Sequence, residues 1–130
     1  MFSYIQRIKS LLKKISGFEQ KMNDIQLALG RIEKRQNDVE MLPTLNTQEF
    51  KVFSQWGEDG IVQFLLRHIK IENNVFIEFG VESFVESNTR FLLVNNNWSG
   101  LVIDGNPDNI SYIKSDPIYW RHNLKADCAF

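Results

Sequence analysis

The chain has 130 residues, of which 43% are hydrophobic and 24% are charged, so it is long enough for one small domain and too apolar for a wholly disordered protein. Fifteen Lys and Arg residues against sixteen Asp and Glu residues give a net charge of −1, which argues against a nucleic-acid partner. The single cysteine, Cys128, excludes an internal disulfide, and no apolar run reaches the roughly 18 residues of a membrane span. Basic residues between Arg7 and Lys14 interrupt the continuous apolar core that a signal peptide needs, so we expect a cytoplasmic protein.

Residues 1–40 form the first unit of the chain. They carry eight basic and five acidic residues, whereas residues 41–130 carry seven and eleven. Apolar residues recur in the first unit at alternating spacings of four and three, and this mean spacing of 3.5 predicts a long coiled-coil-like helix. The positions of this stripe are Tyr4, Ile8, Leu11, Ile15, Phe18, Met22, Ile25, Leu29, Ile32, Gln36 and Val39.

A second copy of the chain is one candidate partner for this helix. In a parallel pair, heptad position g of one helix faces position e of the other, which would bring Lys14 to Glu19 and Arg35 to Glu40. Each such pair contributes only about 0.3–0.5 kcal/mol, enough to favour a parallel over an antiparallel alignment. We therefore expect a homodimer through residues 4–39.

Two other partners for the helix stay open. The stripe could pack on the chain's own domain, or residues 1–18, which carry four bases and no acid, could contact a membrane surface. Gly17 and Gly30 should each weaken the helix by about 1 kcal/mol and produce fraying or a kink. The residue before Pro43 is pushed away from helical dihedrals, so we interpret residues 41–49 as a linker.

Residues 50–130 form the second unit, in which helical and strand patterns alternate. This order is typical of a doubly wound α/β fold with a parallel sheet. The chain stops inside an apolar run, so we expect an incomplete sheet, the first three strands of a larger domain, with one face and one edge poorly covered. The predicted helices are residues 50–69, 87–95 and 107–115, the first capped by Ser54 or Gly57 and the second by Ser87 or Asn88. The predicted strands are residues 75–79, 101–104 and 124–130.

Two acids lie where open α/β sheets bind ligands, at the carboxyl ends of strands. Glu78 lies near the end of the first strand, and Asp104 closes the second. An acid in the second position can accept hydrogen bonds from ribose hydroxyls, each worth about 1.5–3 kcal/mol. The alternatives are that Asp104 caps the following turn and that Glu78 has a structural partner such as Arg90.

Four short segments of the second unit occur in a specific combination. They are SQWGEDG at residues 54–60, FIEFG at 76–80, ESNT at 86–89 and WSGLVIDG at 98–105. Together they resemble the N-terminal half of FkbM-like methyltransferases, which use S-adenosylmethionine (SAM) on a Rossmann-like sheet. The resemblance implies methyl transfer to oxygen, with a sugar, glycan or small secondary metabolite as the acceptor, and a chain that holds only the N-terminal part of the enzyme.

The resemblance also implies roles for individual residues. Glu78 would orient the methionine amino end, Gly80 would admit the cofactor, and Asp104 would hold the ribose. The chain departs from the wider superfamily pattern at Glu82, where a second glycine is usual. The further candidates for contact with SAM are Ser54, Gln55, Ser87 and Asp127, with Glu58 and Asp59 beside the pocket; the alternative for the residues of 54–59 is helix capping.

Other chemistry has less support in the sequence. His122 and Cys128 lack partners at metal-ligand spacing, and no G-x-G-x-x-G or G-K-[ST] segment occurs, which disfavours metal sites, dinucleotide dehydrogenases and P-loop enzymes. Nothing identifies a general base. The alternative function is a non-catalytic interaction module, in which the coiled coil recruits partners and a truncated sheet is inert. The tryptophans Trp56, Trp98 and Trp120 are expected in the core rather than as a stacking platform.

Overall fold

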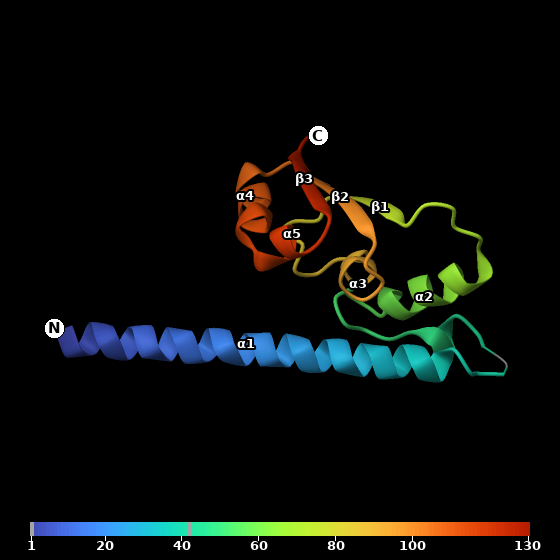
Figure 1. Ribbon diagram of the computed structural model, residues 1–130, viewed down its shortest axis with the longest axis horizontal. Helices are drawn as coiled ribbons and strands as arrows, with labels where there is room; N and C mark the ends of the chain where they lie inside the picture. The colour runs from blue at the N-terminus through green and yellow to red at the C-terminus, as the bar shows by residue number, and fades with distance from the viewer. Residues whose placement is uncertain (1, 42) are drawn as a thin grey trace.

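The computed structural model describes residues 2–41 and 43–130, and for residues 2, 3 and 19 it describes the backbone only. A long helix lies beside a small domain, and its N-terminal part projects beyond that domain (Figure 1). The elements in chain order are α1 (Phe2–Asn37), the 3₁₀ turn η1 (Asn46–Gln48), α2 (Glu58–His68), β1 (Val75–Phe79), α3 (Arg90–Val94), β2 (Ser99–Asp104), α4 (Pro107–Ser115), α5 (Pro117–Arg121) and β3 (Leu124–Cys128).

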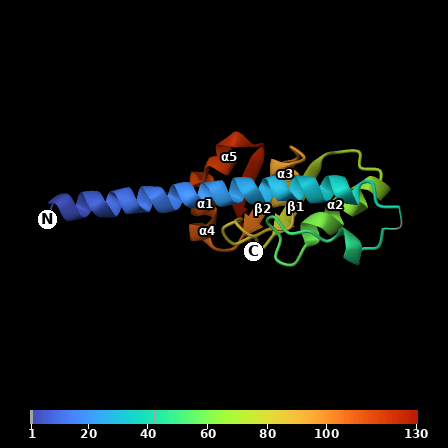
Figure 2. The same cartoon turned by 90° about the horizontal axis from the view of Figure 1, so that it is seen from below.

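The helix α1 runs for 36 residues, as the heptad pattern predicts, and passes through both glycines without a break (Figure 2). The expected kink was therefore wrong. Gly30 is buried, and a Cβ at this position would lie 2.2 Å from Cγ2 of Val52, whereas Gly17 has no neighbour within 4 Å. At Gly30 the domain therefore packs directly against the helix backbone.

The heptad stripe of α1 points away from the domain. Its apolar side chains between Tyr4 and Ile32 are 41–70% exposed. The alternative in which the stripe packs on the chain's own domain is therefore wrong. The helix instead contacts the domain through its opposite face, where Leu27 packs against a small cluster of Phe50, Val52 and Phe91.

The sheet contains three parallel strands in the order β1-β2-β3, with Glu78 paired to Val102 and Ile103 paired to Asp127. Adding strands in one direction through right-handed crossovers places both connections on one face of the sheet. The core accordingly lies on one face only, and α2 also packs against it. Its members include Phe76, Phe84, Leu93, Val102 and Ile113.

The other face of the sheet is the poorly covered one that the sequence predicts. Val75, Ile77 and Phe79 on β1 are 57%, 57% and 72% exposed. The described chain is thus an α/β structure with a one-sided parallel sheet and a long N-terminal helix. The two-sided, doubly wound arrangement expected from the alternation of elements is not present among the described residues.

Two helices begin later than their patterns predict. Gly57 is the N-cap of α2, which confirms one of the two predicted caps, but residues 50–57 are irregular and the helix itself begins at Glu58. The Asp59 carboxylate accepts hydrogen bonds from the backbone N–H groups of residues 52–54 and so keeps them out of the helix. The helix α3 begins at Arg90, with Thr89 as its N-cap instead of Ser87 or Asn88, because Glu78 accepts hydrogen bonds from this segment. Both differences have a tertiary cause.

The third predicted helix is confirmed in full. Pro107 occupies the first turn of α4, and the Asn106 side chain accepts a hydrogen bond from the Asp108 N–H. The short helix α5, capped by Asp116, follows and was not predicted. The expectation for the tryptophans was wrong for two of three: Trp98 packs against the core, whereas Trp56 and Trp120 are 77% and 70% exposed.

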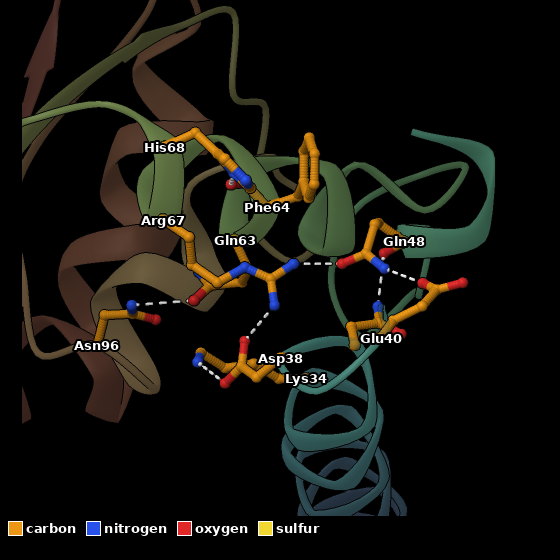
Figure 3. Close-up of polar contacts among 10 residues, drawn as sticks. Lys34, Asp38, Glu40, Gln48, Gln63, Phe64, Arg67, His68 and Asn96 are labelled. Carbon is orange, nitrogen blue, oxygen red and sulfur yellow. Dashed lines mark hydrogen bonds and ion pairs between the residues drawn. The ribbon is translucent and has the colours of Figure 1, made fainter. Parts of the chain in front are cut away.

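The predicted linker of residues 41–49 is tied to the domain, because Gln48 is completely buried and its side chain lies between those of Arg67 and Glu40 (Figure 3). Arg67 of α2 donates to the Gln48 side chain and to Asp38, the latter at 2.5 Å, and Gln48 donates to Glu40. Burial opposes ionisation of Asp38, but Lys34 and Arg67 outweigh it and hold the pKa of this carboxyl below 3.8. This network fixes the C-terminal end of α1 against α2.

Candidate functional site

A polar cleft of about 350 Å³ lies at the carboxyl end of β1, where open α/β sheets bind ligands. Most of its wall is the loop that connects β1 to α3, and one further residue comes from the segment before α2. Four of the residues predicted from the sequence line it, namely Gln55, Glu78, Gly80 and Ser87. The other lining residues are Val81, Glu82, Ser83, Val85, Glu86 and Asn88.

The Glu78 carboxylate binds the C-terminal end of this loop, just before α3. Its Oε2 accepts from the Ser87 Oγ at 2.5 Å and from the Thr89 Oγ1 at 2.5 Å, and its Oε1 accepts from the Asn88 N–H at 3.1 Å. Glu78 therefore has structural hydrogen-bond partners, as the alternative expects, but Arg90 is not one of them. The Arg90 guanidinium instead donates to the Phe84 carbonyl at 2.6 Å. Oε1 accepts only this one bond among the described residues, so Glu78 keeps acceptor capacity towards the cleft.

Asp104 holds the beginning of the same loop. Its Oδ2 accepts from the Glu82 N–H at 2.8 Å, and its Oδ1 accepts from the Asn106 N–H at 2.9 Å and from the Asn109 side chain at 3.0 Å. The Asn106 N–H, the Asn109 amide and the Glu82 N–H outweigh desolvation and hold the pKa of this carboxyl below 3.8. Asp104 thus does cap the following turn, and it lies outside the cleft lining.

The loop backbone contains left-handed residues at the positions where the family pattern has glycines. Gly80 has φ +67° and open space around its missing side chain. Glu82 has φ 49°, a conformation that costs a non-glycine residue about 1–2 kcal/mol. The departure at Glu82 therefore leaves a glycine-like backbone in place, and the bond from its N–H to Asp104 stabilises it.

The segment before α2 divides into a buried part and a part that reaches the cleft. Ser54 is completely buried, and its Oγ accepts from the Asp59 N–H at 3.1 Å, so the capping alternative is correct for this residue. Asp59 is 1% exposed and receives three backbone N–H groups. Neither side chain can contact a ligand in this conformation. Gln55 lines the cleft, while Glu58 accepts from the Trp56 N–H at 2.8 Å.

Asp127 lies away from the cleft. It is exposed on β3, where it pairs with Ile103 of β2, and it shares no lining with the loop that follows β1. The structure therefore brings Gln55, Glu78, Gly80 and Ser87 together and leaves out Ser54, Asp104 and Asp127.

Two acids that line the cleft, Glu82 and Glu86, were not predicted from the sequence as ligand contacts. Their signal was available, because both follow the strand-ending Gly80 and stand four residues apart in a loop. With Glu78 they give the cleft three carboxylates, and its described lining contains no Lys, Arg or His. Such a site attracts cations and repels phosphates. A metal site is not evident in residues 2–41 and 43–130, which contain no group of three His, Cys, Asp or Glu side chains placed to hold an ion.

No family model, curated protein or solved structure matches the chain. The resemblance to FkbM-like methyltransferases therefore stays a prediction. None of the described helices combines the length and apolar character needed to cross a membrane.

Proposed function

We propose that the cleft binds SAM and that the chain carries the cofactor-binding part of a SAM-dependent methyltransferase with a Rossmann-like sheet. The observation that supports this proposal is the set of three carboxylates, Glu78, Glu82 and Glu86, without an opposing base at the carboxyl end of β1. SAM carries a positive ammonium group and a positive sulfonium group, so this field favours it. A nucleotide held by its phosphates would meet repulsion in the same place.

Each residue of the site has a role in this proposal. Glu78 would accept from the ammonium group through its less-used Oε1, and the open space beside Gly80 would admit the ligand. Asp104 would act as a positioning residue, because it fixes the Glu82 backbone from outside the cleft. When bound, SAM would supply an electrophilic methyl group.

The remaining requirements of the reaction are alignment of the acceptor oxygen and removal of its proton. None of the residues described above is assigned to proton removal. We place the acceptor site, for a sugar, glycan or other small molecule, in a further part of the domain. The exposed apolar face of β1, with Ile77 and Phe79, is a suitable surface for that part.

Calorimetry tests the proposal with the whole chain and three ligands: SAM, S-adenosylhomocysteine, which lacks the sulfonium charge, and ADP. We expect SAM to bind and ADP not to bind. Glu82→Gln and Glu86→Gln should each weaken SAM binding by up to about fivefold, the range for an exposed charge pair, and should affect S-adenosylhomocysteine less. Glu72→Gln, in an exposed turn before β1, is the control and should change nothing. ADP binding in preference to SAM would refute the proposal.

The alternative function is a non-catalytic interaction module. It is favoured by the internal hydrogen bonds of Asp104, a residue that is only 8% exposed and whose carboxylate receives three donors from the chain itself. Absence of binding by both SAM and S-adenosylhomocysteine to a correctly folded chain would support this alternative.

A further inference from the structure

We propose that α1 binds a second copy of this chain along its heptad stripe, in parallel orientation, while its opposite face holds its own domain. The inference concerns assembly and does not depend on SAM binding. It follows from where the domain contacts lie in the heptad.

The contacts between α1 and its own domain all lie at heptad positions b, c and f, when Ile8 is at position a. Leu27, at position f, packs against the cluster of Phe50, Val52 and Phe91, and Gly30, at b, lets Val52 approach the backbone. Polar contacts continue the same face. They are Arg31 Nε to Asn95 Oδ1 at 3.1 Å, Asn37 Nδ2 to the Gln48 carbonyl at 2.9 Å, and Arg67 to Asp38.

The face at positions a, d, e and g is free along the described helix. Every side chain described at these positions between residues 4 and 39 is exposed. Figures 1 and 2 show the domain on one side of the rod formed by α1. A dimer through the a and d positions can therefore form without displacing either domain.

The shape of the stripe favours a second helix over a membrane surface. An interfacial helix presents a broad apolar face, whereas the seam of a coiled coil is a narrow stripe at a and d. Ile5 and Leu12 at position e widen the apolar face of residues 4–18, but between residues 20 and 39 the exposed large apolar side chains lie only at a and d. A twofold dimer makes this seam self-complementary, because each copy offers the same residues to the other. Gln36 is the one polar residue at an a position, and such a residue can fix the register.

The charges beside the seam select the parallel orientation. Four of the five g positions are basic, namely Arg7, Lys14, Lys21 and Arg35. An antiparallel pair in full overlap sets g against g, which brings Arg7 to Arg35 and Lys21 to Lys21. A parallel pair sets g against e, and the e positions up to residue 33 hold no base.

One of the two attractive pairs predicted from the sequence is not available. Glu40 lies beyond the end of α1 and accepts from the Gln48 side chain and from Thr47 Oγ1. The other pair, Lys14 with Glu19, involves a side chain outside the described part of the structure. The parallel orientation therefore rests on avoided repulsion between basic g positions.

Sedimentation equilibrium of the whole chain at tens of micromolar tests the dimer. We expect twice the chain mass, and Ile15→Glu combined with Ile25→Glu should weaken association at least 100-fold. Ser10→Glu combined with Ser16→Glu adds the same charge at exposed positions outside the seam, and it should leave the dimer intact. The near-ultraviolet circular dichroism of the core residue Trp98 should be unchanged in both variants, which shows that the domain is folded.

Disulfide trapping tests the orientation. In a Cys128→Ser background, Ile8→Cys should cross-link rapidly under mild oxidation if the two copies of position 8 meet, and Lys9→Cys, outside the seam, should cross-link slowly. Slow cross-linking of a dimeric Ile8→Cys variant would overturn the parallel orientation. A monomer in water, or a chain that becomes helical only on vesicles of phosphatidylcholine and phosphatidylglycerol, would overturn the dimer itself.

Discussion

Replacing each glycine of α1 by alanine separates helix propensity from packing against the domain. Glycine in a helix interior costs about 1 kcal/mol relative to alanine, so Gly17→Ala, with no neighbour within 4 Å, should stabilise the chain by about that amount. At Gly30 the same propensity gain meets a new Cβ that would lie 2.2 Å from Val52 and 3.3 Å from Phe91. Both neighbours are buried, at 5% and 1% exposure, so neither can swing into solvent.

The magnitude follows from the cost of overpacking. Forcing one extra carbon into a filled core costs about 1–3 kcal/mol, which cancels or exceeds the propensity gain at Gly30. The free energies of unfolding of Gly17→Ala and Gly30→Ala should therefore differ by about 1–3 kcal/mol, with Gly30→Ala the less stable. Urea denaturation followed by circular dichroism measures both. Equal stabilisation by the two substitutions would refute the docked position of α1.

Three further predictions concern single side chains of the domain. Asp59→Asn should destabilise the chain by about 1.5–3 kcal/mol in urea denaturation, because the amide oxygen that would accept the three backbone N–H groups carries no charge and the amide nitrogen would be buried without a partner at the Oδ1 position. Partial burial, then Arg121 and Arg90, hold the pKa of His122 below 6.5, so the folded chain binds fewer protons than the unfolded chain and loses stability as the pH falls below 6.5. His122→Gln should flatten the denaturation midpoint against pH in that range. Glu82→Gly should raise the thermal unfolding midpoint slightly, since the strain of a left-handed residue, about 1–2 kcal/mol, exceeds the added entropy of the unfolded glycine, about 0.5–1 kcal/mol; a lower midpoint would contradict this.

The elements that the sequence predicted well begin and end at residues whose own chemistry starts or stops a helix or strand. The strand β1 has four apolar residues out of five and lies between two asparagines and Gly80, and the pattern places it at residues 75–79, as observed. The helix α4 begins at Pro107 and ends before Asp116 and Pro117, which are start and stop signals in their own right. Such signals act within a few residues, so a single sequence suffices to read them.

The features that the sequence missed depend on side-chain partners beyond the next helical turn. Asp59 accepts hydrogen bonds from the backbone of residues 52–54 and so delays the start of α2, and Glu78 receives donors nine to eleven residues away and so delays α3. Helix propensity cannot anticipate either effect. Gly30 is a similar case. The sequence shows only a residue that weakens a helix, whereas the position of Val52 in the fold leaves no room for a side chain there.

The loop between β1 and α3 is held at both ends by the two acids that the sequence had assigned to the cofactor. Asp104 holds the Glu82 backbone, and Glu78 holds Ser87 and its neighbours. Removing either acid would disturb the loop as well as any ligand, so the loss of SAM binding in such a variant has two explanations. The Glu86 side chain is exposed on the cleft and accepts no hydrogen bond among the described residues. Its carboxylate can therefore be removed without loosening the loop, and a selective loss of SAM affinity in Glu86→Gln has only the electrostatic explanation.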